Sequence, residues 1–334
     1  MLTTFLQNYF SDKELRDIFK DVMGTDHPEE IESVLKKVVY EHLKEEIQEI
    51  LFIQSSIGVV FGLLLTNDIK IVLKAYSPKI SLSYLNEMNR IQDIFYQKNF
   101  PAPHVLSPIF KLKNTHAGLY QCIEGTKENA HQNDIRKALA KTLADFSNIV
   151  DQHNLPPLEN FFQQASRRNL WPIPHNVLFN LKKSTRGAGW ITENALKARK
   201  ILSSSHQKKR LAHTDWGIKN AIFQHNKCVG IFDWDSLGSM SELEMVGRAS
   251  AQFTADWESP FKITPTPEEG QLFVKEYEEY REKSFSNDDY KIISASADYL
   301  IAIISRFEHA GNNPIIHPYQ DLLKLCGDKS FLFA

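Results

Sequence analysis

Cysteine and long apolar stretches are both scarce in this sequence. The 334 residues include three cysteines, Cys122, Cys228 and Cys326, which are scattered and odd in number. Such usage does not suit a disulfide framework and favours a reducing compartment. The longest apolar run, from Ile57 to Leu65, is far shorter than the roughly 20 residues that a membrane-spanning helix needs. We therefore expect no membrane partner.

An excess of charge of either sign is also missing. Lys and Arg number 39 against 41 Asp and Glu, which gives a net charge of −2. This balance does not suit a protein that binds nucleic acid through its overall field, and the basic stretch from His206 to Arg210 is only local. The first residues have no basic segment of the secretory type. The expectation is a cytoplasmic protein with no nucleic-acid partner.

Neither an internal repeat nor a low-complexity segment interrupts the chain. Apolar residues make up 42% and charged residues 24%, as in ordinary folded proteins. At roughly 150 residues per domain, the length predicts about two structural units. Residues 1–45 are expected to form an N-terminal helical extension. Ser11 and Glu14 have the spacing of a capping box, and Pro28 with the two acids that follow it is typical of a helix start.

Residues 46–123 have the pattern of a small β-rich lobe. Apolar runs at 47–54, 59–65 and 69–76 are separated by short polar connections, which favours three antiparallel strands. Helical spacing follows over 82–97 and ends at the prolines of 99–103. Two further strands are predicted at 105–113 and 117–123. The expected lobe is an antiparallel five-stranded sheet with one helix.

From residue 124 to residue 334 the pattern is mainly helical. Helices are predicted at 135–149, 190–202, 266–280 and 290–309, with a short hairpin of strands at 221–224 and 228–232. The chain as a whole is therefore expected to be an α+β protein with a small β-rich lobe and a larger helical lobe.

Three oxygen-bearing side chains in this second lobe have a spacing that suits chemistry. Asp215 and Asn220 lie five positions apart in one predicted loop, and the hairpin that follows returns the chain to Asp233. Two carboxylates and an amide suit Mg²⁺, which prefers oxygen ligands and takes several of them from phosphates and water. The pattern indicates phosphoryl transfer.

These residues carry a resemblance to a known family. The pattern His213-x-Asp215-x4-Asn220, followed by a hairpin and Ile-Phe-Asp233-Trp-Asp235, resembles the catalytic and metal-binding loops of the aminoglycoside phosphotransferase and choline kinase family. In the small lobe, Lys74 resembles the family's lysine on the third strand. The resemblance extends over about residues 46–310 and implies a bilobal protein-kinase-like fold with the active site in the cleft between its lobes.

The resemblance also implies roles for individual residues and the identity of the substrates. The phosphate donor would be ATP or another nucleoside triphosphate, bound with Mg²⁺, and the acceptor a hydroxylated small molecule. Asp215 would accept the hydroxyl proton, and His213 would support its loop. The remaining implied roles are metal binding by Asn220 and Asp233, metal or substrate contact by Asp235, phosphate binding by Lys74 with Glu87 as its acidic partner, and adenine contacts in the hinge 119–125, including Gln121 and Ile123.

Two departures from the family pattern keep alternatives open. Thr214 replaces the glycine or asparagine that many members have, and Ser241 to Val246 replaces a downstream Asp-Pro-x-x-Asp-Leu segment. A second hypothesis is therefore a catalytically inactive nucleotide-binding module of the same fold. A third is a metal-dependent phosphohydrolase built from His213, Asp215, Asp233 and Asp235, which would leave Lys74 without a role.

Some neighbouring residues also have two interpretations. Glu242 and Glu244 could receive a cationic substrate, but a solvated helix face is the preferred interpretation. Trp257 is expected to pack in the core or at its rim, with substrate binding as the alternative.

Overall fold

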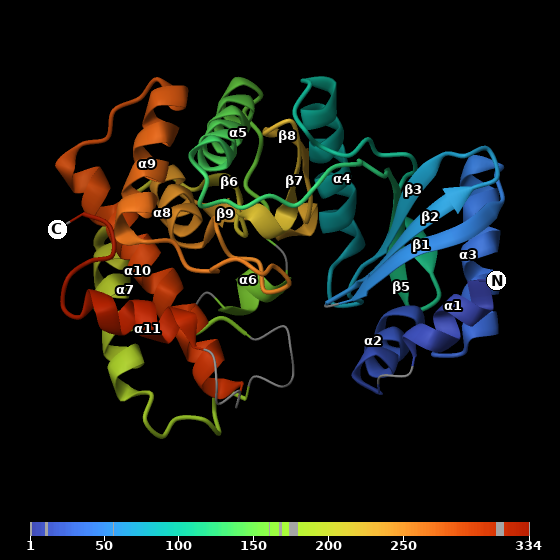
Figure 1. Ribbon diagram of the computed structural model, residues 1–334, viewed down its shortest axis with the longest axis horizontal. Coiled ribbons are helices and arrows are strands. Elements are labelled where there is room, and N and C mark those ends of the chain that lie inside the picture. Colours follow the sequence, from blue (N-terminus) through green and yellow to red (C-terminus); the bar gives the residue numbers. More distant parts are fainter. Residues whose placement is uncertain are drawn as a thin grey trace. The chain divides into compact units, whose positions relative to one another are not determined.

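The computed structural model describes residues 2–10, 13–55, 57–159, 161–166, 169–173, 180–311 and 317–333. The chain divides into two compact units. Unit 1 comprises residues 1–96 and 103–123, and unit 2 comprises residues 97–102 and 124–334. No helix in these ranges is both long and apolar enough to cross a membrane. Figure 1 shows β-strands concentrated in unit 1 and helices dominating unit 2.

An antiparallel sheet of five strands forms the centre of unit 1. The order of neighbouring strands is β1-β2-β3-β5-β4, so β5 lies beside β3 and β4 forms the edge of the sheet. The strands are β1 (Ile47–Ser55), β2 (Val59–Leu65), β3 (Lys70–Ala75), β4 (Phe110–Leu112) and β5 (Thr115–Gln121).

Three N-terminal helices cover one face of this sheet. They are α1 (Leu2–Tyr9), α2 (Lys13–Met23) and α3 (Pro28–Leu43). Their apolar side chains share one core with alternate residues of the strands, and Phe19 meets Phe61 edge to face at 5.8 Å. Pro28 begins α3 and two glutamates occupy its first turn, as the sequence predicts. The predicted capping box at Ser11 lies outside the described residues.

The opposite face of the sheet carries Lys74 and meets helix α4 (Leu82–Gln97). Lys74 pairs with Val60 and Gly118 on the neighbouring strands, so its side chain leaves the face opposite to Leu73 and the N-terminal helices. On this face the Tyr120 hydroxyl donates to Asn89 Oδ1 of α4 (2.6 Å) and lies 2.6 Å from the Tyr76 hydroxyl. A buried polar chain thus ties α4 to β5 and to Tyr76, which directly follows β3.

Unit 2 is built mainly from helices. It also holds two short strand pairs, β6 (Arg210–His213) with β9 (Leu237–Met240), and β7 (Ala221–Gln224) with β8 (Lys227–Ile231). The helices are α5 (Asn133–Gln152), α6 (Phe161–Ser166), α7 (Gly189–Ser204), α8 (Glu242–Gln252), α9 (Pro267–Arg281), α10 (Asn287–Ala310) and α11 (Pro318–Cys326). The helices α7 and α8 both pack against α10, and α5 packs against α9.

The secondary structure departs from the sequence predictions at two places. The strand predicted at 105–113 contracts to β4, and Val105 forms only an isolated bridge with Tyr120. Pro108 interrupts the segment, because proline has no N–H to contribute to a strand ladder. The pairing of β6 with β9 was not anticipated, because each strand has only four residues.

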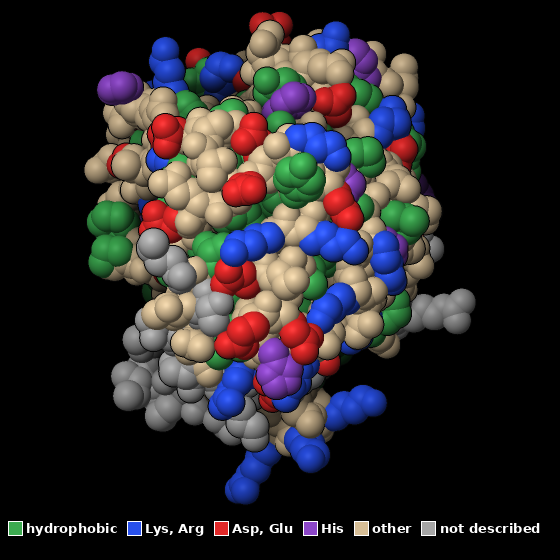
Figure 2. Space-filling view, turned by 90° about the vertical axis from the view of Figure 1, so that its right-hand side faces the viewer, with side chains coloured by type: hydrophobic (Ala, Val, Ile, Leu, Met, Phe, Trp, Pro, Cys, Tyr) green, Lys and Arg blue, Asp and Glu red, His purple; other side chains and the backbone are tan. Residues whose placement is uncertain are grey.

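Positively and negatively charged side chains are mixed on the surface of unit 1. Figure 2 shows Lys and Arg side chains interspersed with Asp and Glu on the face that is turned to the viewer. Several charges of unit 1 form ion pairs, such as Lys36 with Glu32 along α3 at 2.6 Å, and Lys113 of the β4–β5 turn with Glu30 of α3 at 2.9 Å. Exposed pairs of this kind add little stability, typically below about 1 kcal/mol each.

Candidate active site

The site is built on the loop that joins β6 to β7 in unit 2. Asp215 follows β6, and a 3₁₀ turn (Ile218–Asn220) ends at Asn220 directly before β7. The loop is held against the end of α8, because the Ile218 N–H donates to the Phe253 carbonyl at 2.9 Å. At Gly217 a Cβ atom would lie 2.8 Å from the Gln252 carbonyl, so only glycine permits this approach without a shift.

Buried aromatic side chains anchor the loops that carry Asp215 and Asp233. Trp216, directly after Asp215, is fully buried and donates from Nε1 to the Leu139 carbonyl at 3.3 Å. His213 packs edge to face against Trp216, with 5.5 Å between the ring centroids. Trp234, directly after Asp233, is buried and donates to the Ile231 carbonyl at 2.9 Å. Both tryptophans point inward, so the adjacent carboxylates lie at the surface of this aromatic core.

His213 is buried and supports the loop that carries Asp233. Its side chain is 1% exposed, and Nε2 donates to the Phe232 carbonyl at 3.0 Å, one residue before Asp233. Burial lowers the pKa of His213 and outweighs the opposing effects of that carbonyl and of the nearby carboxylates. The neutral imidazole therefore links the two loops.

Hydrogen bonds of the loop hold Asn220 beside Asp233. The Asn220 side-chain amide donates to the Asp215 carbonyl (2.8 Å) and to Asp215 Oδ2 (3.3 Å), which directs Asn220 Oδ1 away from Asp215. The Phe232 N–H donates to the Asn220 carbonyl at 2.8 Å, which fixes Asp233 beside Asn220. Asp233 has a left-handed backbone (φ 59°), a conformation that aspartate adopts more readily than most residues. Asp235 is half-buried in the next 3₁₀ turn (Trp234–Ser236).

This donor set fits Mg²⁺. One amide oxygen and one carboxylate form a sparse set of hard oxygen donors, and Mg²⁺ completes its octahedron with phosphates and water. Within the described ranges, no three His, Cys, Asp or Glu side chains form a cluster able to hold a metal by themselves. A site that needs the substrate's phosphates to complete it is what phosphoryl transfer requires.

Thr214 connects the loop of Asp215 to the loop of Asp233 through hydrogen bonds. Its N–H and its hydroxyl both donate to the Ser236 carbonyl, at 3.0 and 2.8 Å. The Ser236 hydroxyl in turn donates to Asp233 Oδ2. The β-branched residue at this position thus contributes to the positioning of Asp233.

Lys219 is a residue of this loop that the sequence analysis missed. Its ammonium lies 2.8 Å from Asp215 Oδ2 and 5.4 Å from the centroid of the Trp257 ring. Burial acts to lower the pKa of Lys219, but Asp215 and Asp233 outweigh this effect and the pKa is raised. Lys127 holds the same turn, because its ammonium donates to the carbonyls of Ile218 (3.2 Å) and Lys219. The i, i+4 spacing of Asp215 and Lys219 was the available signal in the sequence.

Trp257 does not pack in the core. Its side chain is 55% exposed, and one of its faces stacks on the buried Tyr319 of α11, with 6.5 Å between centroids and 23° between planes. An exposed tryptophan that reaches Lys219, the ion-pair partner of Asp215, is suited to contact a substrate. Of the two expected positions, core or rim, the Trp257 ring therefore takes the rim.

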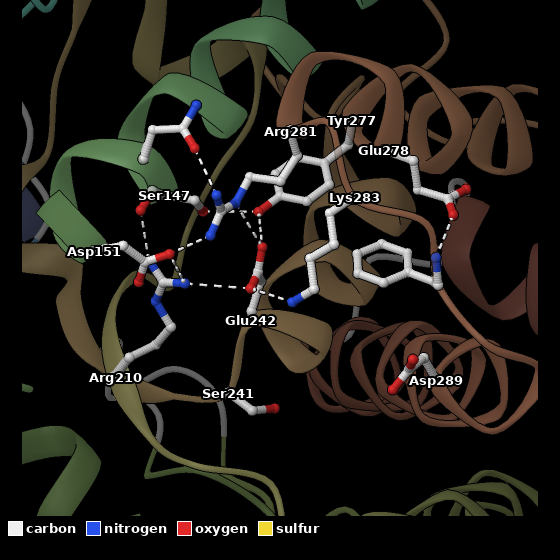
Figure 3. Close-up of polar contacts among 12 residues, drawn as sticks. Ser147, Asp151, Arg210, Ser241, Glu242, Tyr277, Glu278, Arg281, Lys283 and Asp289 are labelled. Atoms are coloured by element: carbon white, nitrogen blue, oxygen red, sulfur yellow. Dashed lines mark hydrogen bonds and ion pairs between the residues drawn. The ribbon is translucent and has the colours of Figure 1, made fainter.

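Glu242 and Glu244 are not on a solvated helix face. Glu242 is 9% exposed and accepts hydrogen bonds from Tyr277 (2.7 Å) and Arg281 (2.9 Å), and it lies 3.1 Å from the Lys283 ammonium. Figure 3 shows these groups and Arg210 converging on its carboxylate. Glu244 completes the capping box with Ser241 and pairs with Lys209. Neither carboxylate is available to a cationic substrate, because tertiary contacts neutralise both.

The predicted nucleotide residues of unit 1 have the following positions. Lys74 is half-buried on β3, with its ammonium 5.5 Å from the centroid of the Tyr76 ring. Glu87 accepts two hydrogen bonds from Arg90, at 2.8 and 2.6 Å. Gln121 ends β5, where its N–H donates to the His104 carbonyl at 2.9 Å, and Ile123 follows it half-buried.

The predicted kinase-like bilobal fold is confirmed by comparison with solved structures of small-molecule kinases and phosphotransferases. An amicoumacin kinase in complex with AMP-PNP, Ca²⁺ and amicoumacin is 13% identical, with a TM-score of 0.59 over 88% of this chain and 90% of that one. The ethanolamine kinase of Plasmodium vivax is 14% identical, with a TM-score of 0.55 over 94% and 93%. A spectinomycin phosphotransferase in complex with ADP and spectinomycin is also 14% identical, with a TM-score of 0.52 over 89% and 94%.

The sequence profile of the phosphotransferase enzyme family matches residues 60–281, a range that contains the loops of both metal-ligand candidates. The chain belongs to this family. No curated protein sequence matches it. The resemblance inferred from the catalytic and metal-binding loops is confirmed.

Proposed function

We propose that this protein transfers the γ-phosphoryl group of ATP, or of another nucleoside triphosphate, to a hydroxyl group of a small molecule. The observation that carries the proposal is the junction of Asp215, Asn220 and Asp233, held by the Asn220 amide and by the Phe232 N–H. The solved relatives are named for small molecules, amicoumacin, ethanolamine and spectinomycin, which supports an acceptor of this class.

In the proposed reaction Asp215 orients the acceptor hydroxyl and takes its proton. The acceptor oxygen forms a bond to the γ-phosphorus while the bond from that phosphorus to the oxygen bridging it to the β-phosphate breaks, and ADP leaves. Asn220 and Asp233 would hold Mg²⁺, which neutralises charge on the phosphates when bound. Catalysis of this kind depends on positioning and electrostatic stabilisation, which suits a site whose loops are fixed by backbone hydrogen bonds.

In the small lobe, residues 46–123, the nucleotide is proposed to contact Lys74 and the hinge segment 119–125 that leads out of this lobe. The acceptor is proposed to bind to the second lobe, residues 124–334. Lys74 would bind the α- and β-phosphates, and Gln121 and Ile123 would meet the adenine through their backbone. The pairing of Lys74 with Glu87 stays a prediction, and it requires Glu87 to leave Arg90, its partner in this structure. Asp235 is proposed as a further metal or substrate contact.

Nucleotide binding is tested first by thermal unfolding with ATP and Mg²⁺. A ligand at 100 times its Kd should stabilise the folded state by about 2.7 kcal/mol. The wild type is expected to show a Mg²⁺-dependent rise in Tm that Asp233→Ala loses, whereas the exposed control Glu279→Ala keeps it. The absence of any rise in the wild type would contradict the proposal.

Phosphoryl transfer is tested with Asp215→Asn. This variant should bind ATP nearly as tightly as the wild type while losing transfer to hydroxylated acceptors. Full activity of the variant would refute the assigned role. Binding without turnover in the wild type would favour the inactive module, and release of phosphate from simple esters without ATP would favour the phosphohydrolase.

A further inference from the structure

Arg248 is a charged residue beside Asp215 that the proposed reaction does not use. It lies on α8, and its Nε donates to the Thr214 carbonyl at 3.4 Å. Among the described residues, its two terminal nitrogens have no hydrogen-bond acceptor, and the residue is half-buried. The guanidinium is therefore anchored through Nε, while the other edge of its fork has no acceptor among these residues.

Each acidic group near this guanidinium already has another partner. Asp215 pairs with Lys219 at 2.8 Å. Glu244 pairs with Lys209 and accepts from the Ser241 N–H at 2.7 Å. Tyr299 donates its hydroxyl proton to the Leu170 carbonyl. Burial lowers the pKa of Arg248, and these groups raise it without fully offsetting that effect.

The remaining acid of the same helix is also committed elsewhere. Figure 3 shows Glu242 among Arg210, Arg281 and Lys283, which together with Tyr277 take up its carboxylate. A partly buried charge without a counter-ion is unfavourable, so such groups are normally paired. An arginine fork binds carboxylate or phosphate oxygens through two parallel hydrogen bonds.

We propose that Arg248 binds an oxyanion group, a carboxylate or a phosphate, of the acceptor whose hydroxyl is placed at Asp215. This inference rests on the proposed function and adds the chemical class of its acceptor. Asp215, Tyr299, Glu244 and Lys219 all interact electrostatically with Arg248. Its Nε binds the carbonyl of Thr214, the residue directly before Asp215, where the proposed reaction places the acceptor hydroxyl. The acceptor, rather than the γ-phosphoryl group, is therefore the assigned source of the oxyanion.

The test uses hydroxylated compounds in matched pairs, each carboxylate or phosphate ester beside its uncharged amide or methyl ester, with ADP release as the readout. The wild type should phosphorylate members of the charged series. Arg248→Gln should raise the KM for an anionic acceptor about 10- to 100-fold, the worth of a hydrogen bond to a charged group, and should change the KM for its neutral partner much less. For the anionic acceptor, Arg248→Lys keeps the charge but not the fork of the guanidinium, so its KM should lie between those of the wild type and Arg248→Gln.

Arg199→Gln is the matched control. Arg199 lies nearby on α7, but it already donates to the Tyr299 hydroxyl at 3.3 Å, so its loss should not discriminate between charged and neutral acceptors. Turnover of only neutral or cationic acceptors would overturn the inference while leaving the proposed function intact. An equal loss for both members of a pair would overturn it as well. A fall in ATP affinity in Arg248→Gln, measured without acceptor, would place the guanidinium on the nucleotide instead.

A binding measurement decides the case in which ATP binds but no compound of the panel releases ADP. With ATP and Mg²⁺ present, the carboxylates and phosphate esters should raise the Tm of the wild type and not that of Arg248→Gln. Equal shifts in both proteins, or none in either, would overturn the inference. Failure of ATP to bind would instead remove the proposed function on which it rests.

Discussion

The Lys219 ammonium lies 2.8 Å from the carboxylate of Asp215, a residue that precedes Lys219 by four positions in the same loop. The pair is set at the point where, in the proposed reaction, a proton leaves the acceptor and negative charge moves between phosphates. A lysine here fixes the orientation of the carboxylate and supplies positive charge close to that movement.

Replacing Lys219 by Met should lower kcat about 10- to 100-fold, because the positive charge beside the reacting groups is lost. Lys219→Arg should retain more activity, because it keeps a cation within reach of Asp215. Steady-state kinetics with ADP release as readout would measure both, with the exposed Lys200→Met as control. Wild-type kcat in Lys219→Met would show that the ion pair has no part in the reaction.

Replacing Trp257 by Ala should weaken acceptor binding with little effect on stability. The ring is 55% exposed, so little burial is lost, but Lys219 loses the aromatic face at 5.4 Å. We expect a several-fold higher acceptor KM, on the order of the 1 kcal/mol typical of such contacts, and a Tm close to that of the wild type. Trp257→Phe should be milder. Phe261→Ala, exposed in the same segment, is the control, and an equal KM change there would contradict a specific role.

Replacing Glu242 by Ala should destabilise unit 2 by about 3–5 kcal/mol, because Arg210, Arg281 and Lys283 would face one another without their shared carboxylate. Glu242→Gln keeps an acceptor for Tyr277 and should cost less. Urea unfolding would measure both, with the exposed Glu279→Ala as the reference. A change below about 0.5 kcal/mol, as usual for surface positions, would show that the network adds no net stability.

The contribution of Glu308 to the stability of the protein should fall as pH rises from about 5 towards 7. Burial raises the pKa of Glu308 from 4.5 to about 7, and nearby Asp321 adds to this effect, although the Tyr319 and Gln320 N–H groups and Lys324 oppose it. The folded state thus holds a proton that the unfolded chain releases near pH 4.5. The stabilisation is complete below that pH and is lost as pH rises through about 7.

Glu308→Gln should flatten this dependence, since the amide does not titrate. Thermal unfolding of both proteins from pH 5 to 8 would measure it, with the exposed Glu279→Gln as control. Burial also raises the pKa of Asp298, to about 6, and lowers that of His213, so the test compares the difference between the two curves, which isolates Glu308. Parallel curves for the wild type and Glu308→Gln would show that this carboxyl does not carry the effect.

Local pattern was sufficient for most of the fold. The helix predicted over 82–97 is α4, and the hairpin at 221–224 and 228–232 is β7 with β8, closed by His225 and Asn226 in left-handed conformations. Alternation and 3.6-residue spacing are local signals, so they can be read without a structure. The prediction of a strand over 105–113 was wrong for most of that range, because Pro108 and an isolated bridge at Val105 replace regular strand pairing there.

The sequence by itself determined the phosphotransferase family, the antiparallel sheet and the two loops that carry Asp215 and Asp233, because each depends on residues close together in the chain. Tertiary structure alone decided that three cations pair with Glu242 and that Trp257 is exposed beside Lys219. It also decided that Arg248 is anchored through Nε while its terminal nitrogens have no acceptor in the described part of the chain. Charge pairing and burial depend on which distant segments pack together. The identity of a side chain fixes its charge, but only the fold decides whether another group neutralises it.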